Sequence, residues 1–306
     1  DPAREIVVTN GATEAVFEAI LAFSGPGDEI VVFEPFYDSY PASAQMAGSA
    51  FVPVRLEPPD WSFDVDALRA AITPRTRLIL LNTPHNPTGK VFTLDELEQI
   101  AALAIERDLL VVTDEVYDRI VFSPAMHISI ASLPGMWERT ITINSTGKTF
   151  SLTGWKIGWA LGPAELVGPI QSAHQFITFA SGTPFQDALA FAMEQSCENG
   201  YYDQLVRDYL HRKNLLESAL AGAELTTLPI GGSYFLMADI SGLGFESDVA
   251  FCEWLVESIG VAAVPPSAFY LEPSTAPLLA RFCFAKSETT IAAAAERLRN
   301  IGSVEP

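Results

Sequence analysis

The sequence of 306 residues contains little cysteine and no long hydrophobic run. Its three cysteines, Cys197, Cys252 and Cys283, are scattered and odd in number, which suits reduced thiols better than a disulfide framework or a zinc site. No apolar segment approaches the ~20 residues of a membrane-spanning helix, and no signal peptide is visible. We therefore expect a cytoplasmic protein without a metal site or a membrane partner.

Positive charge is also scarce. Lysine and arginine total 18 against 38 aspartates and glutamates, a net charge of −20, and the isoelectric point is near 4.4. This balance argues against nucleic acid and acidic membrane surfaces as partners. Any site that binds an anion must therefore be a local cluster of positive charge on an otherwise acidic protein. Because 49% of the residues are hydrophobic and the mean hydropathy is +0.22, the chain should fold, with about two domains.

The chain opens on Asp1 rather than methionine, and a strand is already predicted at residues 5–9 with nothing before it to cover it. We expect the sequence to be a piece of a longer protein whose N-terminal segment is not included.

Hydrophobic segments with strand character alternate with segments of helical periodicity over the first two thirds of the chain. Strands are predicted at 5–9, 29–33, 50–54, 76–81, 109–113 and 140–143, and helices at 15–21, 64–72 and 93–107. Such alternation indicates an α/β fold with a mainly parallel sheet covered by helices on both faces. From about residue 198 the pattern changes to helices at 201–220 and 247–259, strands near 231–237 and 281–284, and a final helix from about Ser287. We therefore predict a large domain at 1–197 and a smaller C-terminal α+β domain at 198–306.

Polar residues follow several of these strands, and in a parallel sheet they should meet at one edge. The turn at 10–14 leads from a strand into a helix and could bind an anion with free backbone N–H groups. The stretch from Asn144 to Trp159 is small, hydroxylated and glycine-containing, with Lys148 near its centre. A lysine amine is reactive only when its proton can leave, which a desolvated site with a second cation such as Lys156 promotes. Taken alone, this stretch is more often a polar surface loop.

Four motifs together resemble the class I/II aminotransferases of pyridoxal phosphate (PLP) fold type I. They are His85-Asn86-Pro87-Thr88-Gly89, Asp114-Glu115-Val116-Tyr117, Ser145-Thr146-Gly147-Lys148-Thr149-Phe150 and Thr153-Gly154-Trp155-Lys156-Ile157-Gly158. Their order and spacing fit the family over nearly the whole chain. Within the family, the lysine motif, Glu34-Pro35-Phe36-Tyr37-Asp38 and the segment from Arg281 to Lys286 look most like the kynurenine/glutamine transaminase and cysteine-conjugate β-lyase branch.

The resemblance implies PLP as the cofactor and Lys148 as the lysine that bonds to it and moves the proton at the substrate Cα. Asp114 would pair with the ring nitrogen and keep it protonated. The other implied cofactor contacts are Asn86 and Tyr117 at the ring oxygen, Tyr37 on the ring face, and Ala12, Thr13, Ser145 and Lys156 at the phosphate.

The same resemblance implies a homodimer that takes a small amino acid and a 2-oxo acid. Arg281, with Asn86 nearby, would bind the substrate α-carboxylate, and Phe179 would reach the neighbouring subunit's site. Two departures stand out. Lys156 replaces an arginine found in many relatives, and Thr13 replaces a lysine that serves acidic substrates in one bacterial branch. We therefore expect large neutral or aromatic donors, and a cis Asn86-Pro87 bond as in the family.

Three alternatives bear on function. A P-loop is rejected, because Thr142 stands where that motif requires glycine. A C–S β-lyase or a decarboxylase on the same scaffold would use the same Lys148 and Asp114, and remains open. A PLP-sensing regulator also remains open, and would need a basic, helix-turn-helix-like segment upstream.

Overall fold

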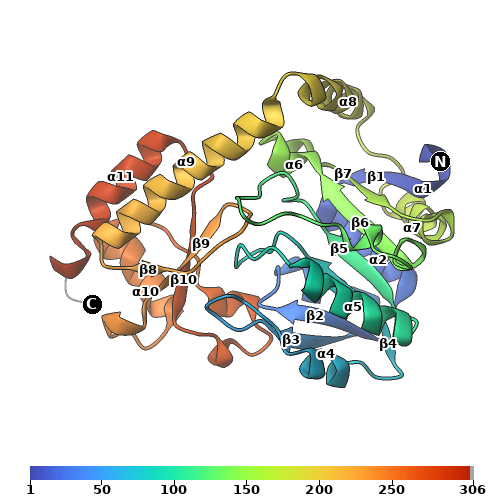
Figure 1. Ribbon diagram of the computed structural model, residues 1–306, viewed down its shortest axis with the longest axis horizontal. Coiled ribbons are helices and arrows are strands. Elements are labelled where there is room, and N and C mark those ends of the chain that lie inside the picture. The colour runs from blue at the N-terminus through green and yellow to red at the C-terminus, as the bar shows by residue number, and fades with distance from the viewer. Residues whose placement is uncertain (304–306) are drawn as a thin grey trace.

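Seven strands form one sheet, in the order β1-β7-β6-β5-β4-β2-β3, in the computed structural model, which describes residues 1–303 (Figure 1). The strands are β1 (Ile6–Asn10), β2 (Glu29–Glu34), β3 (Ala50–Arg55), β4 (Thr76–Asn82), β5 (Leu110–Asp114), β6 (Thr140–Ser145) and β7 (Ile157–Leu161). Neighbours from β3 to β6 pair in parallel, and β7 runs antiparallel to both β6 and β1. The predicted mainly parallel sheet is confirmed.

Helices cover both faces of this sheet. The covering helices are α2 (Ala12–Phe23), α3 (Ser39–Ala47), α4 (Val65–Ala71), α5 (Leu94–Glu106) and α7 (Ala164–Ile177). The short helices α1 (Pro2–Glu5) and α6 (Thr146–Thr149) contact β1 and β7, and α8 (Thr183–Glu198) protrudes from the sheet (Figure 1). Along β2, Ile30 and Val32 join the hydrophobic cluster under α2, α3 and α7, whereas Val31 and Phe33 join the one under α4 and α5. Because both faces are buried, β2 reads as a continuous hydrophobic run.

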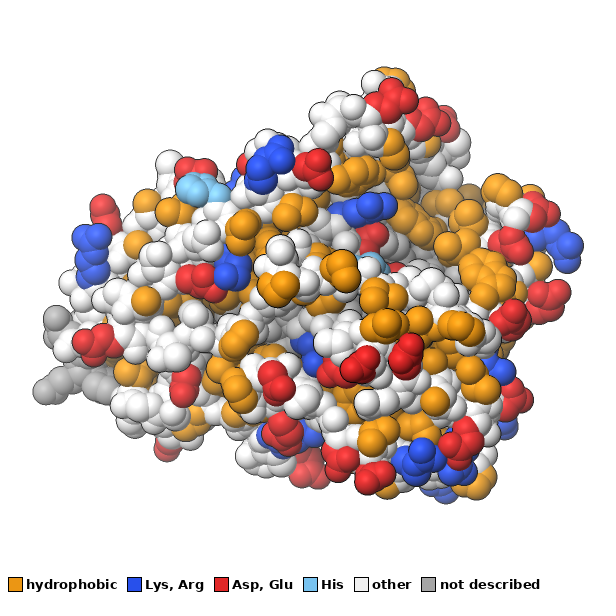
Figure 2. Space-filling view, viewed as in Figure 1, with side chains coloured by type: hydrophobic (Ala, Val, Ile, Leu, Met, Phe, Trp, Pro, Cys, Tyr) orange, Lys and Arg blue, Asp and Glu red, His pale blue; other side chains and the backbone are white. Residues whose placement is uncertain are grey.

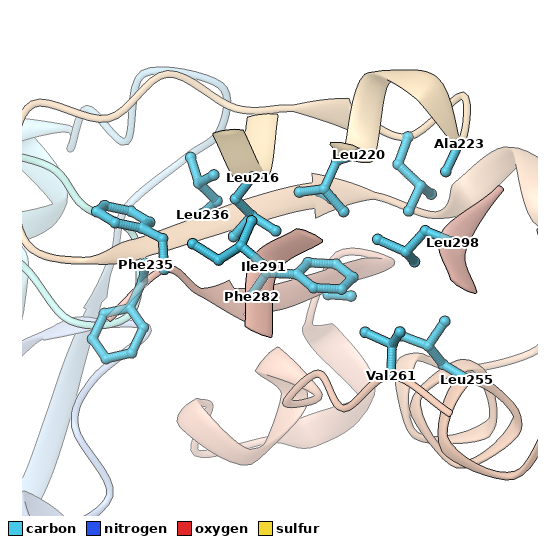
Figure 3. Close-up of a cluster of buried hydrophobic side chains, with 14 of the residues drawn as sticks. Leu216, Leu220, Ala223, Phe235, Leu236, Leu255, Val261, Phe282, Ile291 and Leu298 are labelled. Atoms are coloured by element: carbon cyan, nitrogen blue, oxygen red, sulfur yellow. The ribbon is translucent and has the colours of Figure 1, made fainter. Parts of the chain in front are cut away.

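The C-terminal part has its own antiparallel sheet, in the order β10-β9-β8 (Figure 1). Its hydrophobic cluster (Figure 3) also takes in Val116 and Ile120, which follow β5. Its strands are β8 (Thr226–Thr227), β9 (Phe235–Asp239) and β10 (Leu279–Cys283), and its helices are α9 (Tyr201–Gly222), α10 (Asp248–Trp254) and α11 (Glu288–Leu298). Figure 3 shows Leu216, Phe282 and Ile291 meeting between these elements. The boundary at 197/198 stays a prediction.

Several local predictions need correction. The strand predicted at 231–237 begins only at Phe235, and the helix predicted at 247–259 is α10 followed by the π-helical η5 (Leu255–Ile259). The stretch after β6 contains two short elements that were not predicted, α6 and the 3₁₀ helix η3 (Thr153–Trp155). The cis Asn86-Pro87 bond is confirmed. Within residues 1–303, no helix combines the length and the apolar character needed to cross a membrane.

Candidate active site

A cavity of about 370 Å³ opens beside the carboxyl ends of β4, β5 and β6. Its walls include most of the predicted site residues: Ala12, Thr13, Tyr37, Asn86, Asp114, Tyr117, Ser145, Lys148, Lys156 and Arg281. They come from both parts of the chain, since Arg281 lies on β10 and the others on the large sheet and its connections. Phe179 does not line this cavity and is 77% exposed.

Asp114 is the last residue of β5 and is only 6% exposed. The Tyr40 hydroxyl donates to its Oδ2 at 2.7 Å, and the Val116 N–H donates to Oδ1 at 3.2 Å. Burial raises the pKa of the Asp114 carboxyl, whereas these two hydrogen bonds and the nearby charge of Lys148 oppose that rise. The site therefore contains a buried carboxylate that accepts two hydrogen bonds and lies close enough to Lys148 to feel its charge.

Asn82, at the end of β4, fixes the neighbouring loop. Its side-chain amide donates to the Asp114 carbonyl at 2.9 Å, and its Oδ1 accepts from the Asn86 N–H at 2.8 Å. The Asn86 side chain in turn accepts from Arg281 Nη1 at 2.8 Å. This chain of hydrogen bonds ties Asp114 and Asn86 to Arg281, on β10 in the C-terminal part of the chain.

Arg281 lies between two aromatic rings. Its Cζ is 4.2 Å from the centroid of the Phe235 ring and 4.6 Å from that of Phe269. Its Nε is buried without a hydrogen-bond partner among the described residues. Burial lowers the pKa of the guanidinium from its usual value, but arginine remains charged at neutral pH. An oriented cation with free donors can bind a carboxylate with two hydrogen bonds.

Lys148 lies in α6, directly after β6. Its Nζ is 5.6 Å from the ring centroids of both Tyr117 and Tyr234, which meet edge to face at 5.1 Å. Tyr117 is 3% exposed, and burial raises the pKa of its hydroxyl well above 10. The amine is thus held among aromatic rings, with Asp114 as the nearby acid.

One corner of the cavity suits an anion. Helix α2 begins at Ala12 after Gly11, whose φ of 81° places it in the left-handed region and which has no side chain to cap the helix. The N–H groups of Ala12 and Thr13 therefore remain available. Lys156 Nζ lies 3.1 Å from the point where a Cβ on Gly11 would be. A Cβ on Gly158 would lie 2.6 Å from Ala12 N, so glycine is needed for β7 to approach the start of α2.

Four side chains at this site were not predicted. Tyr40 donates to Asp114, Tyr234 contacts Lys148, and Phe235 and Phe269 enclose Arg281. The only relevant signal in the sequence was the aromatic content near Tyr37 and in the strand at 231–237. Apolar or aromatic residues in such places are usually core, so the sequence alone does not single these four out.

The comparisons with known proteins agree on one family. The family model of class I and II aminotransferases matches residues 1–298. A probable N-succinyldiaminopimelate aminotransferase of Mycobacterium tuberculosis is 43% identical over 97% of this chain and 77% of its own length. Kynurenine–oxoglutarate transaminase 3 of Mus musculus is 39% identical over 98% of this chain and 71% of its own.

The fold agrees as well. The crystal structure of a methionine aminotransferase from Escherichia coli superposes with a TM-score of 0.94 at 40% identity, over 98% of this chain and 78% of that one.

Proposed function

The chain belongs to the class I and II aminotransferase family, and we propose that this aminotransferase uses pyridoxal 5′-phosphate and takes its amino group from a large neutral or aromatic L-amino acid. The acceptor is a 2-oxo acid. One observation carries the proposal: a single cavity brings Lys148 and Asp114 together with Asn86, Tyr117 and Arg281.

The residues present fit the cofactor. Its phosphate suits the corner made by the N–H groups of Ala12 and Thr13, Ser145 and Lys156, where the glycines at 11 and 158 leave room. Its ring would have Tyr37 on one face, with Asn86 and Tyr117 at the ring oxygen. Asp114, buried and supplied with hydrogen-bond donors, suits a protonated ring nitrogen. When bound, pyridoxal phosphate supplies an electron-accepting ring conjugated to the amino group.

The chain's own residues then divide the work. Lys148 would hold the cofactor and, once the incoming amino acid has freed its amine, would take the proton from the Cα of the amino donor. In the second half-reaction it would deliver a proton to the Cα of the new amino acid. Arg281 and Asn86 orient the substrate by its α-carboxylate. The aromatic walls around Lys148 reduce the access of water, which strengthens each charge interaction in the site.

The cavity wall and the names of two relatives support the proposed donor class. Tyr37, Val264, Ala268 and Phe269 present apolar or aromatic surface, which suits a large uncharged side chain. Thr13 offers no cation for a side-chain carboxylate. The names of related proteins include methionine and kynurenine aminotransferases. Since the related proteins named here are aminotransferases, neither the β-lyase nor the regulator alternative is favoured.

We also propose that the enzyme is a homodimer in which Phe179 reaches the partner's site. Phe179 has a φ of 73° and follows α7, and its side chain and that of Phe176 are 77% and 86% exposed. Figure 2 shows hydrophobic side chains gathered in the hollow beneath the protruding α8. Exposed apolar surface of this kind is typical of an interface. A cytoplasmic location also stays a prediction, and the three free cysteines fit it.

The experiment is a screen of amino donors against several 2-oxo acids with the protein loaded with pyridoxal phosphate. We expect the highest kcat/KM for aromatic and large neutral donors and little turnover of aspartate. Lys148→Ala should abolish both turnover and the lysine-dependent absorbance of the bound cofactor. Turnover with an unchanged spectrum in that variant would remove Lys148 from its role, and a preference for aspartate would refute the donor class.

A further inference from the structure

Tyr40 contacts the predicted ring-nitrogen partner directly, although it lies outside the predicted site. It is the second residue of α3 and is 1% exposed. Its hydroxyl donates to Asp114 Oδ2 at 2.7 Å, across a separation of 74 residues. The other oxygen of that carboxylate accepts from the Val116 N–H. The two donors together fix the plane of the Asp114 carboxylate.

The same side chain also supports Tyr37. The two rings meet edge to face, with centroids 5.6 Å apart and an interplanar angle of 82°. Tyr40 itself packs into the hydrophobic cluster beneath α2 and α3, so its ring has little freedom to move. One side chain therefore contacts both the acid proposed for the ring nitrogen and the aromatic ring proposed for the ring face.

We propose that Tyr40 is a positioning residue whose hydroxyl keeps Asp114 oriented and ionised for the ring nitrogen of the cofactor, while its ring holds Tyr37 in place for stacking. This inference rests on the proposed function, because both contacts are meaningful only if pyridoxal phosphate occupies the cavity.

The electrostatics of the site support this assignment. Burial raises the pKa of Asp114, and the hydrogen bond from Tyr40 is the largest influence that lowers it, ahead of the Val116 N–H and the charge of Lys148. The neighbouring carboxylate of Glu115 acts in the opposite direction. Burial, with Asp114 beside it, raises the pKa of Tyr40 well above 10, so Tyr40 retains its proton and remains the donor.

Tyr40→Phe tests the hydroxyl alone, because it keeps the ring that packs against Tyr37. We expect the apoprotein to bind pyridoxal phosphate about tenfold more weakly in a spectroscopic titration, as for the loss of a hydrogen bond to a charged group. As the pH is lowered, the variant should lose its affinity for the cofactor at a higher pH than the wild type does. The reason is that Asp114 takes up a proton more readily without the Tyr40 donor.

Tyr270→Phe is the matched control. Tyr270 is also buried, at 4% exposure, but its hydroxyl has no hydrogen-bond partner among the described residues. This variant should bind the cofactor as the wild type does. Thermal denaturation of both variants separates a general loss of stability from a specific effect on the site.

A cofactor analogue with carbon in place of the ring nitrogen tests the route of the effect. If Tyr40 acts through Asp114, the tenfold difference between wild type and Tyr40→Phe should disappear with this analogue. If Tyr40→Phe binds both ligands more weakly by the same factor, Tyr40 acts through packing only and the proposal for its hydroxyl is overturned. The proposal is also overturned if Tyr40→Phe binds pyridoxal phosphate as tightly as the wild type does. Tyr40→Leu, which also removes the ring, should weaken both ligands, and unchanged binding of the analogue would overturn the role in supporting Tyr37.

Cofactor binding by the wild type distinguishes failure of the proposed function from failure of the role of Tyr40. A wild-type protein that binds no pyridoxal phosphate would refute the proposed function and the role of Tyr40 together. A wild type that binds it with Lys148-dependent absorbance, beside an unaffected Tyr40→Phe, would refute only the inference drawn here.

Discussion

Arg281 combines three constraints that a lysine could not satisfy together. Its planar guanidinium lies between the rings of Phe235 and Phe269, donates one hydrogen bond to Asn86, and keeps Nε without a partner among residues 1–303. Planarity allows stacking and a two-point hydrogen bond to a carboxylate at the same time. The ammonium group of a lysine keeps the charge but loses the fork and the stacking.

Arg281→Lys should therefore weaken amino-acid binding far more than cofactor binding. We expect a rise in KM for the amino donor that corresponds to about 2 kcal/mol, the order found when a partner of a buried charge pair is altered. Pyridoxal phosphate affinity, measured by titration of the apoprotein, should change little. Equal losses of both affinities would contradict the assignment of Arg281 to the substrate carboxylate.

The sequence made some of these residues predictable and others not, for a physical reason. Lys148 and Asp114 belong to motifs whose chemistry is restrictive, so their types and order carry the signal. Tyr40 and Phe269 act through tertiary contacts, with Asp114 and with Arg281. Locally, each resembles an ordinary core aromatic, and no spacing rule links Tyr40 to Asp114, 74 residues away, or Phe269 to Arg281.

At the scale of elements, the anion corner depends on how closely β7 approaches the start of α2. A Cβ at Gly158 would meet Ala12 N and the Gly11 carbonyl carbon at 2.6 Å, which no real Cβ tolerates. Gly154 belongs to the same sequence motif, but a Cβ there would have no described atom within 4 Å. The two glycines thus form a matched pair, one required by packing and one not.

Gly158→Ala should lower stability by about 1–3 kcal/mol, the usual cost of overpacking, and weaken pyridoxal phosphate binding because the N–H groups at the start of α2 must shift. Gly154→Ala should leave both properties close to those of the wild type. Chemical denaturation and cofactor titration measure the two effects. Similar behaviour of the two variants would show that the approach of β7 does not shape the phosphate corner.

Helix α2 is also tied to α7 by a buried acid. Glu18 is 0% exposed, and its Oε1 lies 2.9 Å from His174 Nδ1. Its Oε2 has no hydrogen-bond partner in the described part of the chain. Burial is the main cause that raises the pKa of Glu18 from 4.5 to about 7, although its contacts with His174 oppose the shift. The folded protein therefore holds this proton more tightly than the unfolded chain does.

The sign of the pH dependence follows from that difference. As the pH rises from 4.5 to about 7, the unfolded chain releases the proton first, so Glu18 contributes progressively less stability. The glutamine in Glu18→Gln does not titrate. The free energy of unfolding of this variant, relative to that of the wild type, should therefore increase as the pH rises through this window, by at most about 1.4 kcal/mol per pH unit. Urea unfolding at several pH values measures the difference, and a constant offset over the window would rule out the raised pKa.

The elements themselves were predictable where burial on both faces gives long hydrophobic runs, as in β4 and β5. Several elements were missed, among them α7 and α8, and α3 and β7 show why. Residues 39–47 include serines, a proline and a glutamine, which weakens the helical pattern. The five residues of β7 directly follow a glycine-containing motif, so they read as its continuation. Both are held by tertiary packing rather than by local preference.

At the scale of the whole molecule, an acidic body of net charge −20 gathers Lys148, Lys156 and Arg281 around one cavity. The negative charge of the rest of the protein repels anions in general. The cavity should therefore favour an anionic ligand that contacts all three of these cationic side chains. The alternation of strands and helices predicted the large sheet, because parallel strands require helical crossovers. How the C-terminal part of the chain brings Arg281 against Asn86 depends on contacts between distant segments, which the alternation does not encode.

The exposed apolar side chains around the end of α7 concern the assembly. Phe176 and Phe179 are largely exposed here, which is unfavourable unless another surface covers them. Phe176→Asp combined with Phe179→Asp should convert a dimer into a monomer, because two charges would have to be buried at the interface. Val249→Asp with Val256→Asp is a matched control, since these valines are 42% and 50% exposed on α10 and η5. Sedimentation velocity at micromolar concentration distinguishes monomer from dimer. A monomeric wild type would contradict the proposed interface, and so would a double variant at 176 and 179 that is still a dimer.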